Sequence, residues 1–224
     1  MIVIFLILCS MLIILHAQYI TYYTPSKTLH EVYYNLAETG DIVYFRWKDV
    51  AFTHELISPF THIGLIVIDP DTDKRYIIET HLAGDGKQLG IYKGGINVYP
   101  LKERLEKYEG HTFLTKLKYR RPNNIDVNEF LSNVEKFQTE IPFHDEYTEY
   151  FTRNCLTKRV CKDCFDIEKK AGMFCSEFIA FCLKELDIVP VDFDHECLAP
   201  GDFRYVQHVN GDYLYDDLIR IKKN

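Results

Sequence analysis

The sequence predicts an α+β domain whose sheet is mainly antiparallel. Strand-like and helix-like runs both occur along the chain, but they do not alternate in the regular βαβ order of a parallel sheet. Two apolar runs, 61–68 and 76–81, flank the turn-forming residues 69–73, as expected for a hairpin. The 224 residues, 47% of them hydrophobic, are enough to bury the core of one domain, expected over 26–224.

After its N-terminal segment the chain is expected to form a short helix over 26–37. Thr28 and Glu31 have the spacing of a capping box, and Gly40 follows as a stop signal. Four runs that are rich in β-branched or aromatic residues are then expected to be strands, at 41–47, 61–68, 76–81 and 96–99, with a glycine-rich loop over 84–95.

The second half of the chain is expected to mix helices with strands. Pro100 suits the first turn of a helix over 100–108, and Gly110 suits its end. The stretch 141–171 shows no hydrophobic period and is expected to contain a cysteine-rich insert at about 144–171. The remaining elements are expected to be strands over 113–120 and 213–221 and helices over 126–138 and 172–186.

The charge of the chain argues against nucleic-acid binding. The formal net charge is −7, whereas proteins that bind nucleic acids through phosphates carry basic surfaces. One basic cluster, Lys116–Arg121, alternates like a strand and is expected to be a solvated strand face. Contact with an anionic lipid surface is the alternative for this cluster.

Residues 1–20 are predicted to form a hydrophobic helix that anchors the protein in a membrane as a single transmembrane helix. Ile2–Leu15 is almost wholly apolar, but a helix of that stretch alone spans about 21 Å of a hydrocarbon core of about 30 Å, so flanking residues would have to join it. A signal peptide cleaved near His16–Gln18, giving a secreted protein, is the alternative. No basic residue precedes the run, and Leu15 is large for the −3 position, so the anchor is favoured.

The cysteines outside the N-terminal segment leave the redox state open. Cys161 and Cys164 have the C-x-x-C spacing of a zinc knuckle, and Cys155 lies nearby, but only His195 or Cys197 could complete four ligands. A local disulfide or free thiols fit these cysteines better than zinc. We therefore expect no metal and no cofactor.

Cys175 is the first candidate for chemistry. Phe178, Phe181, Cys182 and Leu186 follow at helical spacing, which places Cys175 in the first turn of an amphipathic helix. The unpaired N–H groups of a helix start favour a thiolate. The alternative is that Cys175 is a small buried apolar residue, as most core cysteines are.

A base for Cys175 is expected at His62, which interrupts an otherwise apolar strand. Gly64 lies on the same strand face and leaves room for a close neighbour. In the hairpin, Glu79 would lie beside His62, and an imidazole held by a third polar group can take a thiol proton. The alternatives are a hydrogen-bonded core histidine and an exposed carboxylate, and His54 and His81 are further histidines nearby.

Five segments in this order resemble the circularly permuted NlpC-type papain-like family of cysteine hydrolases and acyltransferases. The family includes bacterial peptidoglycan amidases, the lecithin:retinol acyltransferase group, YiiX-like proteins and proteins of poxviruses and other large DNA viruses. In ordinary papain-like enzymes the cysteine helix precedes the histidine strand, whereas here it follows it. The resemblance covers roughly residues 38–205, and its segments are Gly40–Phe45, Thr61–Leu65, Ile78–Glu79, Pro100–Leu105 and Phe174–Phe178.

The resemblance implies a papain-like domain with Cys175 as the nucleophile, His62 as the general base and Glu79 as the residue that orients the ring. The backbone N–H of Cys175 would then be an oxyanion donor. Asp41 matches a family position that is expected to be structural. Ser176 is the alternative nucleophile, but the family match and thiol reactivity favour Cys175.

The expected function is that of a membrane-anchored thiol hydrolase or acyltransferase that cleaves an amide or ester bond. The anchor favours a lipid or lipidated substrate over a peptide amide, and the viral relatives suggest a viral protein. The alternative is a catalytically silent, membrane-tethered structural or binding protein on the same fold.

Overall fold

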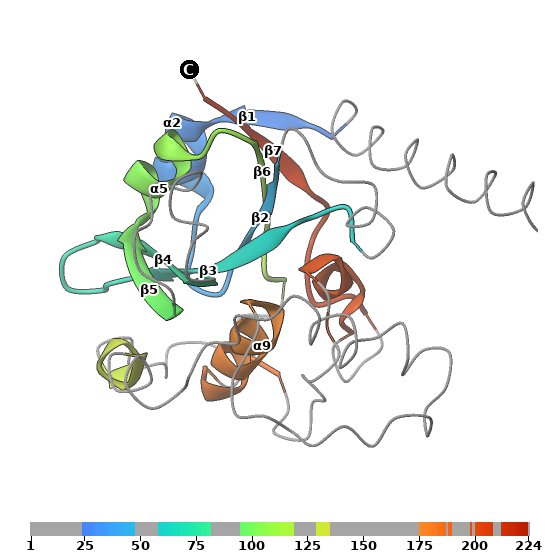
Figure 1. Cartoon of the computed structure of the whole chain (residues 1–224). Helices are drawn as coiled ribbons and strands as arrows, with labels where there is room; N and C mark the ends of the chain where they lie inside the picture. The colour runs from blue at the N-terminus through green and yellow to red at the C-terminus, as the bar shows by residue number, and fades with distance from the viewer. Residues whose placement is uncertain are drawn as a thin grey trace, which may run out of the picture.

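A seven-stranded, mainly antiparallel sheet forms the centre of the domain, and a small number of helices pack on it (Figure 1). The computed structural model describes residues 24–47, 58–81, 95–118, 129–134, 175–186, 188–189, 198, 200–207 and 212–223. The strand order is β1-β7-β6-β2-β3-β4-β5, with β1 and β7 parallel and the other neighbours antiparallel. The predicted mixture of helices with a mainly antiparallel sheet is therefore confirmed.

The described elements fall into strands and short helices. The strands are β1 (Ser26–Thr28), β2 (Ile42–Arg46), β3 (His62–Ile68), β4 (Arg75–His81), β5 (Gly95–Pro100), β6 (His111–Thr115) and β7 (Ile219–Lys222). The helical elements are α2 (Leu29–Glu31), the π-helix η1 (Val32–Leu36), α5 (Leu101–Lys107), α9 (Cys175–Glu185) and the 3₁₀-helix η2 (Pro200–Tyr205).

The central hairpin of β3 and β4 forms as predicted. Leu65 pairs with Ile78, and Ile68 pairs with Arg75. In the turn, the Asp69 carboxylate accepts hydrogen bonds from the backbone of Asp71 and the hydroxyl of Thr72. Short polar side chains of this kind stabilise turns by bonding to the nearby chain, so the turn fixes the register of the two strands.

The expected helix over 26–37 is corrected at its start. Ser26–Thr28 is a strand, because it pairs in parallel with β7 along Arg220–Lys222. The Thr28–Glu31 capping box is present, and the chain continues from it as a π-helix to Leu36. Tertiary pairing with the C-terminal strand thus shortens the helix that the local pattern predicts.

The expected strands over 113–120 and 213–221 are also shorter in the structure. β6 ends at Thr115, and beyond it Leu117 forms a single bridge to Tyr215 before β7 begins at Ile219. The expected loop near Pro200 is a 3₁₀-helix. Of the expected helix over 126–138, residues 129–134 are described and are helical, with Phe130 and Val134 buried.

The sheet separates two apolar clusters, one on each face. Ile63 and Leu65 of β3 belong to the larger cluster together with buried residues of α9, such as Phe178. Ile66 of β3 belongs to the smaller cluster together with Leu101 and Leu105 of α5. α9 therefore covers one face of the sheet, and α5 and η1 cover the other (Figure 1).

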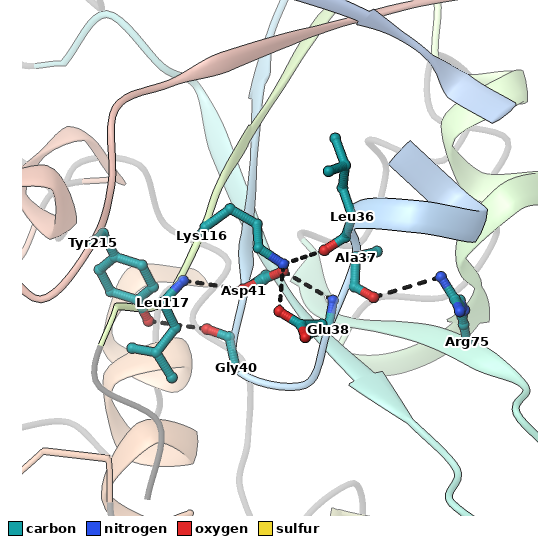
Figure 2. A network of polar contacts seen from close by, with 9 residues as sticks. All are labelled: Leu36, Ala37, Glu38, Gly40, Asp41, Arg75, Lys116, Leu117 and Tyr215. Atoms are coloured by element: carbon teal, nitrogen blue, oxygen red, sulfur yellow. Dashed lines mark hydrogen bonds and ion pairs between the residues drawn. The ribbon is translucent and has the colours of Figure 1, made fainter. Parts of the chain in front are cut away.

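Asp41 joins two separate parts of the chain, residues 36–41 and 116–117, in a polar network (Figure 2). Its carboxylate, which has no exposed surface, accepts hydrogen bonds from the backbone of Glu38 and Leu117 and from the Lys116 ammonium. Lys116 also bonds to the Leu36 carbonyl and the Glu38 carboxylate. The contacts show a structural role for Asp41, and they make Lys116 a partly buried ion-pair partner in place of the expected solvated side chain.

The prediction of a transmembrane helix is wrong for the part of the chain that the structure describes. Among those residues no helix is both long enough and apolar enough to cross a membrane. Residues 1–20, on which the predictions of an anchor and of a cleaved signal peptide rest, lie outside the described residues. The cysteine-rich insert at about 144–171 lies outside them as well.

Candidate active site

His62 and Glu79 form a buried pair across neighbouring strands. The Nε2 atom of His62 lies 2.7 Å from Oε2 of Glu79. Glu79 has no exposed surface and His62 is 7% exposed. The expectation that these two side chains would lie together is met, and the alternative of a carboxylate exposed to water is excluded by its burial.

Gly64 makes room for this pair. A Cβ atom added at Gly64 would lie 2.6 Å from Cδ1 of Ile77 and 2.9 Å from Cγ of Glu79. Contacts that short do not occur between real side-chain carbons, so any larger residue would displace Ile77 or Glu79. The glycine between His62 and Ile66 is therefore required by the close approach of the β4 side chains.

Arg104 of α5 completes the cluster around Glu79. Its Nε atom donates to Oε1 of Glu79 at 2.7 Å, and its Nη2 atom donates to Oε2 at 3.0 Å. The guanidinium also lies over the rings of Phe45, at 4.6 Å, and Tyr108, at 5.4 Å. A buried carboxylate is stable only when it is paired, and this forked ion pair supplies the missing positive charge.

No role for Arg104 is predicted from the sequence, although the sequence contains a pattern that points to one. Leu101, Arg104, Leu105 and Tyr108 recur at helical spacing, and all four are buried. An arginine on the apolar stripe of a short helix requires a buried acceptor. Glu79, a carboxylate within an apolar strand, requires a buried cation or donor. The sequence could therefore have suggested that Arg104 and Glu79 pair.

Cys175 begins α9, and the helix packs against β3 and β4. The cysteine is a free thiol and the residue as a whole is partly exposed. The sulfur is hydrogen-bonded by the backbone of Ile63, which is the neighbour of His62, and by that of Ser176. The sulfur of the expected nucleophile therefore contacts the backbone of the residue that follows the expected base in β3.

The Cys175 thiol is protonated at neutral pH. Burial raises its pKa to about 12, and the backbone of Ile63 and Ser176 and the carboxylates of Glu177 and Glu79 modify this value less than burial does. The expected lowering by the helix start is thus outweighed by desolvation. A thiol of this kind needs a base at the moment of attack.

The thiol and the imidazole approach the same end of β3 from the two faces of the sheet. His62 lies on the α5 face, where its ring is 5.4 Å from the ring of Phe45, whereas α9 covers the Ile63 face. In the described strands, β3 pairs with β4 from Leu65 to Ile68, and Ile63 precedes this paired stretch. The backbone of Ile63 bonds to the Cys175 thiol at this end of β3.

The other candidate residues lie elsewhere or outside the described part of the chain. Ser176 has no exposed surface, and Cys182 is buried farther along α9. The described residues contain no group of three or more histidine, cysteine, aspartate or glutamate side chains that could hold a metal ion. His54, the side chain of His81, and Cys155, Cys161, Cys164, His195 and Cys197 lie outside the described residues, so the zinc alternative stays a prediction.

No protein family model matches the sequence, and no curated protein matches it.

Proposed function

We propose that the protein is a cysteine-dependent hydrolase or acyltransferase that breaks an amide or ester bond. Cys175 would be the nucleophile, His62 the general base and Glu79 the residue that orients the His62 ring. The domain would be a permuted papain-like domain, because the histidine strand precedes the cysteine helix in the chain. The described sheet and the helix packed against it are compatible with that fold.

One observation supports the proposal most strongly: Cys175 meets the backbone of Ile63 beside a His62 ring that is already hydrogen-bonded to Glu79. Nucleophilic catalysis by a thiol requires a nearby base whose ring is held by a third group. The proposal is supported by the presence of all three residues at one end of β3 and β4, although they are separated in the sequence.

The proposed reaction follows from the neutral thiol. His62 takes the proton from Cys175 as the sulfur bonds to the substrate carbonyl carbon, and the resulting imidazolium then gives the proton to the leaving amine or alcohol. The bond to the leaving group breaks and an acyl-thioester remains. Water or a second acceptor then attacks this thioester, which restores the thiol, and the backbone N–H of Cys175 would bind the developing oxyanion.

The test is covalent labelling by thiol-reactive acyl probes, with one panel of acyl-lipid probes and one of peptide-amide probes. We expect labelling of the unmodified protein, its complete loss in Cys175→Ala, and strongly slowed labelling in His62→Ala. The control is Cys182→Ala, which removes the other described free cysteine and should label as the parent does. Unchanged labelling of Cys175→Ala would overturn the assignment.

A second candidate is a catalytically silent structural or binding protein on the same scaffold. The raised pKa of the Cys175 thiol favours this alternative, because a buried neutral thiol is also what a packing cysteine shows. The labelling experiment separates the two: a folded protein whose Cys175 is inert toward every probe is silent.

A further inference from the structure

Arg104 holds the Glu79 carboxylate in a bidentate, buried ion pair. Two of its nitrogens bond to the two oxygens of one carboxylate, and its side chain is 2% exposed. The rings of Phe45 and Tyr108 hold the guanidinium over their faces. The plane and position of the guanidinium are thereby fixed, and a planar fork fixes the plane of the carboxylate that it binds.

The carboxylate oxygen Oε2 is shared between the two partners of Glu79. Nη2 of Arg104 lies 3.0 Å from it and Nε2 of His62 lies 2.7 Å from it. A neutral imidazole that donates from Nε2 to this oxygen has its basic lone pair on Nδ1. The orientation of the fork therefore determines both the direction of the ring and the nitrogen that can accept a proton.

Arg104 also cancels the charge of Glu79. An unpaired carboxylate 2.7 Å from an imidazole would favour the imidazolium, which cannot accept a proton from a thiol. With the guanidinium on the same carboxylate, the net charge beside the ring is zero, so the ring can stay neutral.

The other titratable groups near the cluster do not replace this effect. Burial raises the pKa values of Tyr99 and Cys175 to about 12 and that of Tyr108 higher, so these three groups are uncharged at neutral pH. Glu177 of α9 acts on the Cys175 thiol from the other face of the sheet. Among the described groups near His62, Arg104 is a cation that pairs directly with Glu79.

We propose that Arg104 is a positioning residue of the active site: it holds the Glu79 carboxylate and cancels its charge, so that His62 is a neutral and oriented base for Cys175. The inference rests on the proposed function for its catalytic part. The electrostatic part can be measured on the folded protein whether or not the protein is an enzyme.

The experiment is a histidine titration by nuclear magnetic resonance on the full chain, with the signal of His62 identified by its loss in His62→Gln. In Arg104→Gln we expect the pKa of His62 to rise by about one pH unit or more, because the Glu79 charge is no longer cancelled. The matched control is Lys107→Gln, which removes one positive charge from the exposed side of the same helix and should leave His62 unchanged. An unchanged His62 in a folded Arg104→Gln protein would overturn the proposal.

Arg104→Lys provides a second test that holds even when Arg104→Gln does not fold. Lysine keeps the charge but cannot form the fork, so the pKa of His62 should stay close to that of the parent. The rate of Cys175 alkylation should nevertheless fall about tenfold or more, because the ring is no longer held in place. An undiminished alkylation rate would overturn the positioning role.

The two proposals fail in different ways. If Arg104→Gln shifts His62 but the alkylation of Cys175 is insensitive to His62→Ala, the proposed function is wrong and the electrostatic role of Arg104 stands. If alkylation depends on His62 while neither Arg104 variant changes it, the proposed function stands and the role of Arg104 is wrong.

Discussion

At the scale of single residues, the candidate site depends on how a carboxylate with no exposed surface is stabilised. Glu79 accepts from the Arg104 guanidinium through both oxygens and lies 2.7 Å from the His62 ring. Removing one partner of a buried ion pair lowers the free energy of unfolding by more than the intact pair contributes to it. The remaining charge stays buried without a partner.

Glu79→Ala should therefore destabilise the protein strongly. It leaves the Arg104 guanidinium buried and unpaired, and we expect the free energy of unfolding to fall by about 3–5 kcal/mol in denaturant titrations. The matched control is Glu103→Ala on the neighbouring helix α5, since Glu103 pairs with Lys107 with both side chains more than half exposed. That change should cost at most about 1 kcal/mol. Equal losses in the two variants would contradict the account of Glu79 as a buried, doubly paired carboxylate.

At the scale of elements, the geometry of the site depends on how tightly β3 and β4 pack at Gly64. The Glu79 and Ile77 side chains occupy the space that a Cβ atom at Gly64 would need. The site is thus built by two neighbouring strands and by the start of α9, which contacts both of them.

Gly64→Ala should destabilise the hairpin by about 1–3 kcal/mol, because the added methyl group overlaps both neighbours. Ile77→Ala removes both Cδ1 and Cγ1, which lie 2.6 Å and 2.7 Å from the added carbon, so the double variant should recover part of the loss. The measurement is a double-mutant cycle in denaturant unfolding. Strictly additive effects would show that the overlap at Ile77 does not cause the loss.

The elements that the sequence predicts well are those whose pattern is local. The β3–β4 hairpin and α5 were predictable because period-2 alternation, turn residues and Pro100 all agree. The first helix was predicted too long because Ser26–Thr28 pairs with β7, a contact nearly 200 residues away that no local pattern contains.

In the candidate site, too, the features set by local pattern were predictable and those set by tertiary packing were not. His62 and Glu79 were predictable as a pair, because the turn sets the register of their strands. Arg104 was missed because its role depends on the packing of α5 over the sheet. The state of the Cys175 thiol was missed because burial, which the sequence does not report, outweighs the effect of a helix start.

At the scale of the whole molecule, burial keeps several acidic groups neutral. It raises the pKa values of Cys175 and Tyr99 to about 12, and it also raises those of Cys182, Tyr44 and Tyr108. In the unfolded chain, thiols and phenols lose their protons near pH 9.0 and 10.0 respectively. Above these values the unfolded state binds fewer protons than the folded state, so stability must fall as the pH rises.

We therefore expect an alkaline loss of stability with a defined window. The contribution of these groups should be fully present below about pH 9 and should decline between pH 9 and 12, by up to about 1.4 kcal/mol per pH unit for each group. Denaturant unfolding at a series of pH values measures this decline, and Cys175→Ala should show a smaller slope. A stability that is constant from pH 8 to 11 would contradict the burial of these groups.

The central claim, that His62 is the base for the Cys175 thiol, is tested most directly by labelling Cys175 across pH. In the unmodified protein the labelling rate should rise through an inflection in the range where imidazole titrates, about pH 6–8, because His62 takes the thiol proton. In His62→Ala this inflection should disappear, and labelling should increase only as the pH approaches about 12, the pKa to which burial raises the thiol. Identical profiles for the two proteins would show that His62 does not activate Cys175.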